Sequence, residues 1–355
     1  MNARASIKAR RLDAGSSPTG PAVQRHQERP EARRSRLSRP NPLCETGSLT
    51  LSTVIRHLAA TADGADLFAS AEFEKRVAVW SLARRRRVAE FDTVLDFGGC
   101  RLAVIPGEPP IVIAAAYHVH GVVAYDGWSG EQLWQRRDIK KAQRVTALDG
   151  TWIGVGVEKG PLQVLRARTG TTLRQMAGLK GLITGERGYL GWSDSWIRAF
   201  DAEEAAPVGR RIEGHPLAAS AGPDGFLVGN VIFSNGPTLQ KLSAIGEEQW
   251  RTSIDGWHAT GVFHRPAAGT WLAHLFDPHR SGHRLLVLAD DGAVLSDREL
   301  PRGVMVSAFM AGADALLVGE FLDHEGERRW RGQALAPSTL QPLWTFAEGV
   351  REVPA

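Results

Sequence analysis

The sequence predicts an all-β fold: a single β-propeller of seven four-stranded blades. Two observations lead to this prediction. The stretch Val122–Asp138, VVAYDGWSGEQLWQRRD, consists of two short apolar runs around a turn that contains glycine, a pattern typical of a β-hairpin. Weaker copies of this hairpin recur along the chain at intervals of 35 to 46 residues. One small sheet cannot bury both of its faces alone, so hairpins repeated at this period are expected to stack side by side in a ring.

Seven units follow one another from Val54 onward, each with four short apolar runs separated by turn residues. Seven lies within the typical range of about four to eight blades, and counts of six or eight remain open. All units read in the same strand order, so the sequence does not show how the ring closes; Ser48–Thr53 could add a strand that covers the last edge. The third strands are predicted to begin near Val77, Val122, Leu162, Ile197, Leu239, Leu285 and Trp330.

A small set of residues defines the repeat: an aspartate after the third strand, a glycine in the following turn, and a tryptophan on the fourth strand. Glycine permits the positive φ that a short hairpin turn can require, and an indole offers a broad surface for packing against the next blade. An architectural role is therefore predicted for Asp126, Gly130, Trp134, Gly170, Asp201, Gly246, Trp250, Gly292 and Trp344.

Two units resemble known propeller families. Val54–Asp92 is similar to a WD-repeat blade in the order of its parts, although it lacks the Gly-His start and has Trp80-Ser81 where that family has Trp-Asp. The second unit resembles the A-x-D-x-x-[ST]-G-x-x-L-W repeat of quinoprotein-type propellers, at Ala124, Asp126, Ser129, Gly130, Leu133 and Trp134. The resemblance implies the propeller fold. It would also imply pyrroloquinoline quinone with Ca²⁺ in an exported dehydrogenase, but the chain has neither an export signal nor adjacent cysteines, so no cofactor is expected.

Charge divides the chain into a basic tail at residues 1–47 and a nearly neutral propeller at residues 48–355. The tail contains ten Lys or Arg and four Asp or Glu, which leaves 33 basic and 35 acidic residues for the remainder. Its Arg, Ser and Pro content without hydrophobic periodicity predicts disorder. Five arginines between Arg29 and Arg39 leave open nucleic-acid or anionic-membrane binding through this tail, but no aromatic residue lies among them, and a solvated leader is favoured.

The sequence favours a cytoplasmic protein without membrane insertion. Its two cysteines, Cys44 and Cys100, match neither a disulfide framework nor a metal-binding spacing. The N-terminus lacks the apolar segment of a secretory signal, and no stretch approaches the roughly 18 apolar residues of a membrane helix.

The alternative hypothesis is a propeller enzyme or metal-binding protein with a site at the mouth of the central channel, and two histidine clusters are the candidates for that site. His118 and His120 lie two apart at a strand end, which places both imidazoles on one face. His274, Asp277, His279 and His283 are predicted to lie on one loop of the sixth unit. The sequence places no third ligand beside His118 and His120, so a solvent-facing pair is favoured there. The second group would help to line a binding face, and its spacings match no common zinc ligand framework.

No catalytic motif is present, and the predicted function is a non-enzymatic scaffold that binds another protein or peptide, as a subunit of a bacterial multi-protein assembly. Connections between second and third strands share one rim of a propeller, and exposed loops commonly carry binding residues. Aromatic members would anchor a partner and acidic members would set its polarity. The predicted rim residues are His118, His120, Trp192, Asp194, Phe233, Asn235, Asp277, His279, Asp323 and Glu325.

Overall fold

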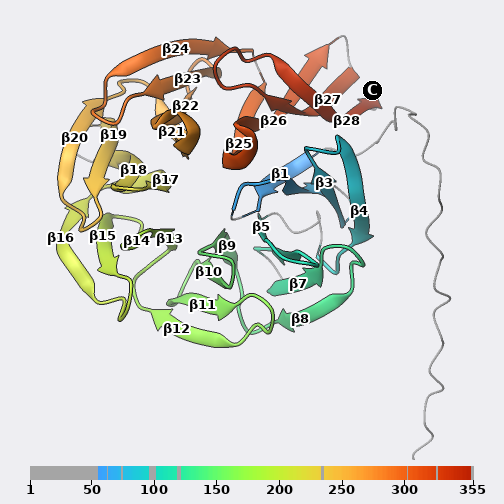
Figure 1. Ribbon diagram of the computed structural model, residues 1–355, viewed down its shortest axis with the longest axis horizontal. Helices are drawn as coiled ribbons and strands as arrows, with labels where there is room; N and C mark the ends of the chain where they lie inside the picture. The colour runs from blue at the N-terminus through green and yellow to red at the C-terminus, as the bar shows by residue number, and fades with distance from the viewer. Residues whose placement is uncertain are drawn as a thin grey trace, which may run out of the picture. The chain divides into compact units, whose positions relative to one another are not determined.

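The computed structural model describes residues 55–61, 63–72, 75–95, 101–117, 121–232, 236–301, 303–324 and 327–352. These residues form seven sheets arranged in a ring, and each sheet contains four consecutive antiparallel strands (Figure 1). The predicted all-β propeller with seven four-stranded blades is confirmed. The predictions for residues 1–47 and for Ser48–Thr53 lie outside the described residues.

Each predicted third-strand start lies within the third strand of a blade. Short apolar runs bounded by Gly, Asp and Pro give strands of five to eleven residues. The blades are β1 (Ile55–Ala60), β2 (Leu67–Glu72), β3 (Arg76–Ser81) and β4 (Arg86–Asp92); β5 (Arg101–Ile105), β6 (Ile111–Ala115), β7 (Val122–Asp126) and β8 (Gln132–Arg136); β9 (Ala142–Ala147), β10 (Trp152–Val157), β11 (Leu162–Arg166) and β12 (Thr172–Met176); β13 (Gly181–Gly185), β14 (Gly188–Trp192), β15 (Trp196–Asp201) and β16 (Pro207–Glu213); β17 (His215–Gly222), β18 (Gly225–Ile232), β19 (Gly236–Ser243) and β20 (Glu248–Ser253); β21 (His258–Arg265), β22 (Thr270–Asp277), β23 (Gly282–Leu288) and β24 (Val294–Leu300); and β25 (Val304–Met310), β26 (Ala315–His324), β27 (Glu327–Leu335) and β28 (Pro342–Glu352).

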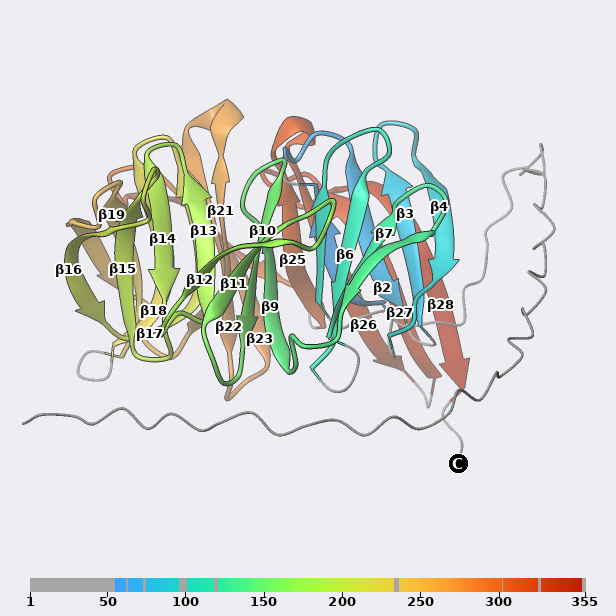
Figure 2. The same ribbon diagram turned by 90° about the horizontal axis from the view of Figure 1, so that it is seen from below.

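The ring has two rims, which follow from the antiparallel order of the strands. The first strand of each blade lies at the centre and the fourth lies outside (Figure 1). The A–B rim carries the first and third turns of each blade, including the 3-10 turns η2 (Pro266–Ala268) and η3 (Ala311–Ala313) at the upper edge of Figure 2. The B–C rim carries the second turn of each blade and the links between blades. No helix in the described part of the chain is long and apolar enough to cross a membrane.

The turn between the third and fourth strands contains a residue with positive φ in all seven blades. Glycine adopts this left-handed conformation without steric penalty, whereas other residues are strained there. Four of the seven positions are glycine and three are not. The residues, with φ between 49° and 88°, are Arg85, Gly130, Gly170, Ala205, Gly246, Gly292 and Leu340.

Tryptophans on fourth strands pack against the turn glycine of the next blade. A Cβ atom on Gly170 would lie 2.7 Å from Cδ2 of Trp134, and the Trp134 indole N–H donates a 2.7 Å hydrogen bond to the carbonyl of Ala167. Trp250 repeats the arrangement against Gly292, where a Cβ atom would lie 2.8 Å from Cδ2. The glycine therefore serves two purposes: it permits the turn, and it leaves room for the indole of the preceding blade.

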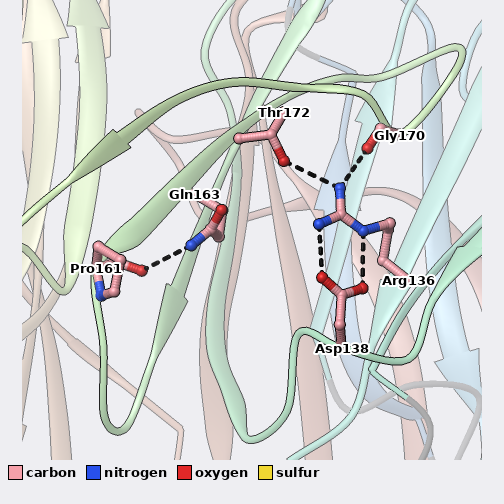
Figure 3. A network of polar contacts seen from close by, with 6 residues as sticks. All are labelled: Arg136, Asp138, Pro161, Gln163, Gly170 and Thr172. Carbon is pink, nitrogen blue, oxygen red and sulfur yellow. Dashed lines mark hydrogen bonds and ion pairs between the residues drawn. The ribbon is translucent and has the colours of Figure 1, made fainter. Parts of the chain in front are cut away.

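Arg136 adds a polar connection between the second and third blades (Figure 3). Its Nε and Nη2 atoms donate to the two carboxylate oxygens of Asp138 at 2.8 and 2.7 Å. Its Nη1 atom donates to the Gly170 carbonyl at 2.8 Å and to Thr172 Oγ1 at 3.0 Å, both on the next blade. All three nitrogen atoms of the guanidinium therefore donate hydrogen bonds within the fold.

A buried cation connects the fifth and sixth blades. Lys241 on β19 is 1% exposed and pairs with Asp290, in the turn that contains Gly292. The ammonium also lies 4.6 Å from the ring centroid of Trp271, whose indole N–H donates to Asp290 Oδ1 at 2.9 Å. Burial alone would raise the pKa of Asp290, but the hydrogen bonds from Lys241 and Trp271 outweigh it and lower that pKa. One carboxylate thus satisfies both a cation and an indole.

The ring closes between the last and first blades through side chains and turns. The Gly312 N–H donates a 2.9 Å hydrogen bond to the carbonyl of Gly64. An aromatic cluster joins β28 to the first blade, with ring centroids 4.8 to 6.4 Å apart, a range in which aromatic pairs attract. Every sheet in the described chain is made of consecutive strands, so the blades share no strand. The cluster contains Phe68, Trp80, Trp344 and Phe346.

Candidate functional site at the mouth of the central channel

The first strands of all seven blades line a cavity of about 270 Å³ at the centre of the ring. One part of its wall is apolar and includes Ile183, Val262 and Phe263. The polar part includes Arg101 and Arg144. The cavity therefore combines positive charge with an apolar surface.

The seven first strands contain no aspartate or glutamate along their described lengths. Their basic residues lie mainly near the beginning of each strand, which is the end at the B–C rim. Arg265, at the opposite end of β21, is paired with Asp314 at 2.6 Å. The ionisable side chains that line the cavity are therefore all basic: His57, Arg101 and Arg144. His215 and His258 are the first residues of β17 and β21.

Arg144 and Trp192 form the centre of this site. The Arg144 guanidinium lies 5.5 Å from the ring centroid of Trp192. Within the described residues Arg144 has no hydrogen bond or ion pair, and the Trp192 indole nitrogen, in a side chain that is 4% exposed, has no acceptor. Among the described residues, the indole donor thus has no acceptor and the neighbouring cation has no hydrogen-bonded or ion-paired carboxylate.

Gly181 explains how Trp192, the last residue of the second strand β14, reaches the channel wall. It pairs with Trp192 in the sheet, and a Cβ atom on Gly181 would lie 2.1 Å from Cζ2 of the indole. Any side chain at this position would displace the ring. The missing Cβ atom allows the indole to lie across the inner strand.

Burial and neighbouring charges together set the pKa values at the mouth. Burial and the neighbouring Arg101 charge lower the pKa of Arg144, whereas the carboxylate of Asp194 acts in the opposite direction. Burial and the same Arg101 charge lower the pKa of His57 to about 4. His57 is therefore neutral near pH 7, and its Nδ1 accepts a 3.2 Å hydrogen bond from the Leu102 N–H. The arginines supply the charge of the site.

Four of the ten predicted rim residues have described side chains, and they lie at the second turns of the fourth and sixth blades. Trp192 is buried against the channel, and Asp194, two residues later, is exposed and accepts a hydrogen bond at its carbonyl from His215. Asp277 caps its own turn by accepting the His279 N–H at 2.8 Å. Asp323 lies in β26, with its side chain outside the description. The other five, His118, His120, Phe233, Asn235 and Glu325, lie outside the described residues.

The histidines of the sixth blade differ from the predicted loop cluster. His274 and His283 lie in β22 and β23, not on a loop, and their Nε2 and Nδ1 atoms are 3.1 Å apart. His274 also shares a 2.9 Å hydrogen bond with Thr260 on the channel strand β21. Burial, followed by the His283 charge, lowers the pKa of His274 to about 4. In the described part of the chain, no three His, Cys, Asp or Glu side chains come together as metal ligands.

Arg101 and Arg144 were not found by reasoning from sequence. The basic runs that stand out in the sequence, such as Arg84–Arg87, lie on an outer strand and the turn before it. The available signal was weaker: single arginines near the start of apolar first strands that contain no acidic residue. These arginines can be identified as neighbours only once the structure shows that the first strands begin at the same rim of the ring.

Comparison with known proteins finds similar folds but no matching protein family. No family model matches the chain, and no curated protein matches its sequence. Solved structures resemble it at the level of fold, including U3-55K (TM-score 0.58, 10% identity, 76% of this chain and 89% of that chain). The computationally designed Ika8 protein is also similar (0.57, 13%, 84% and 88%), as is BamB from Moraxella catarrhalis (0.51, 12%, 79% and 82%). The chain is a seven-bladed β-propeller with a basic channel mouth.

Proposed function

We propose that this protein is a non-enzymatic scaffold that binds another protein through its B–C rim, as one subunit of a bacterial multi-protein assembly. The observation that supports this most is the channel mouth, where Arg144 and Trp192 lack an anionic partner while cations elsewhere, such as Arg136 and Lys241, are paired within the fold. Fixed side chains on a rigid ring are suited to recognition because little conformational entropy is lost on binding.

Site-specific photocrosslinking in the native host tests this proposal. A photoreactive amino acid replaces the exposed Asp194 or His279 on the B–C rim, and Asp224, in the turn between β17 and β18, serves as the control on the A–B rim. The expected result is one discrete adduct, identified by mass spectrometry, from both B–C positions and none from Asp224. Equal adducts from the two rims, or an adduct from Asp224 alone, would contradict the proposal.

A further inference from the structure

Two cation and tryptophan pairs in this molecule differ in whether a carboxylate joins the cation to the indole. Lys241 lies 4.6 Å from the Trp271 ring and Arg144 lies 5.5 Å from the Trp192 ring. In the first pair, Asp290 accepts hydrogen bonds from both the cation and the indole N–H. In the second pair, the Trp192 indole N–H has no acceptor among the described residues, and no carboxylate there forms an ion pair with Arg144. The second pair therefore lacks a carboxylate that the first pair has.

From this difference we propose that the channel mouth binds a carboxylate side chain, presented by an acidic segment of the partner protein that also carries apolar residues. The proposal rests on the proposed function and names the chemistry of the partner. The carboxylate contacts the guanidinium of Arg144, with Arg101 adding charge, in the geometry that makes arginine a strong partner for carboxylates.

The apolar wall of the cavity favours a polypeptide segment as the source of the carboxylate. Ile183, Val262 and Phe263 lie in the same cavity as the two arginines, and a small inorganic anion would leave this surface uncovered. A neighbouring apolar side chain of the partner segment covers it and adds hydrophobic stabilisation.

The chain's own N-terminal segment lacks the complementary charge. Residues 1–47 contain ten Lys or Arg and only four Asp or Glu. A segment with this balance is repelled by a basic channel mouth, so charge complementarity favours a separate, acidic partner.

Fluorescence anisotropy with the purified full-length protein tests this site directly. The probe is a fluorescein-labelled hexapeptide of alternating Glu and Leu, and the matched peptide with Gln in place of Glu is the control. The expected result is saturable, salt-sensitive binding of the acidic peptide and at least tenfold weaker binding of the Gln peptide. Comparable binding of both peptides would overturn the proposal. Free glutarate or phosphate that binds as tightly as the peptide would also overturn it, because the site would then serve a small anion.

Variants locate the site. Arg144→Gln is expected to weaken peptide binding by about tenfold or more, while Arg84→Gln, which removes the same charge from the A–B rim, changes it by less than about twofold because exposed charges contribute little. Trp192→Phe keeps an aromatic ring near the guanidinium and removes the indole donor together with part of the ring, so a loss of about two- to fivefold is expected, in line with one hydrogen bond. Thermal melting of each variant shows that it is folded.

Unchanged affinity in folded Arg144→Gln overturns the proposal. If that variant does not fold, an unchanged affinity in Trp192→Phe overturns it.

The two proposals fail in different ways. Peptide binding that depends on Arg144, without a rim-specific crosslink in the host, would support the carboxylate site and contradict the scaffold function. A B–C rim crosslink that persists in Arg144→Gln would support the scaffold function and contradict the carboxylate site.

Discussion

The outer and inner strands of the ring carry charge in different ways. Outer strands contain both signs, and ion pairs involve them: Arg136 on β8 pairs with Asp138, and Asp297 on β24 pairs with Arg284 on β23. Inner strands contain no acidic residue in their described lengths, and Arg144 pairs with none. A buried charge without a counterion lowers stability, whereas a buried charge with one is tolerated. The charges of these outer pairs are therefore compensated within the fold, whereas Arg144 has no ion pair among the described residues.

The largest effect is expected from separating the buried pair between the fifth and sixth blades. Asp290→Ala leaves the Lys241 ammonium, whose side chain is 1% exposed, without its carboxylate. We expect the free energy of unfolding to fall by about 2–4 kcal/mol, slightly less than for a fully buried pair because Asp290 is 58% exposed. Urea denaturation followed by tryptophan fluorescence measures the change.

Lys241→Met is the matched control for this prediction. It removes the buried charge, keeps a similar volume, and leaves Asp290 partly in water with its hydrogen bond from Trp271. The expected loss is less than about 1.5 kcal/mol, because a buried pair replaced by an apolar side chain is often nearly neutral. A larger loss for Lys241→Met than for Asp290→Ala would show that the ion pair is not what stabilises this contact.

The fold could be predicted from the sequence because the repeat is a local signal. Strand periodicity and turn glycines lie close together in the chain, so the seven third strands were found even where the hairpin motif is degenerate. The positive φ in the turn between the third and fourth strands could not be predicted in three blades, where Arg85, Ala205 and Leu340 adopt the conformation that glycine adopts in the other four. Tertiary packing imposes this conformation on side chains that do not favour it.

The candidate site could not be predicted as a whole, because it is formed by residues that come together from different blades. The rim residues were predicted from the positions of loops alone, whereas Arg101 and Arg144 lie on first strands of different blades, 43 residues apart by number. Gly181 carries no positive φ, and its role follows only from the position of Trp192 in space. Sequence spacing cannot show such contacts between elements distant in the chain.

A smaller effect is expected when the glycine beneath a fourth-strand tryptophan is replaced. Gly170→Ala places a Cβ atom 2.7 Å from Trp134 at a φ of +68°. We expect the free energy of unfolding to fall by about 2–3 kcal/mol, the sum of backbone strain and displacement of the indole. Thermal unfolding by circular dichroism measures it.

Gly256→Ala separates the two contributions. Gly256 has a φ of +78°, and nothing lies within 4 Å of its added Cβ atom. Only backbone strain applies, so the expected loss is about 1 kcal/mol. Equal losses at the two positions would mean that the contact between Gly170 and Trp134 contributes nothing to stability. Packing between outer strands would then not be a source of stability at this position.

The smallest expected effect is a difference in how the inner and outer parts of the ring contribute to the pH dependence of stability. The pKa values of His57 and His274, in or beside the channel wall, are lowered to about 4, so the unfolded chain, with histidine pKa values near 6.5, binds more protons between these limits. Stability is therefore complete above pH 6.5 and decreases as pH falls towards 4, by about 1 kcal/mol per histidine between pH 7 and 5.5. The pKa values of the outer carboxylates Asp138 and Asp290 are lowered instead, so their contribution is lost only below about pH 3.8. Urea denaturation as a function of pH should thus show two windows, and His274→Gln should reduce the slope of the first window alone. A slope that His274→Gln leaves unchanged would place the titrating groups away from the inner strands.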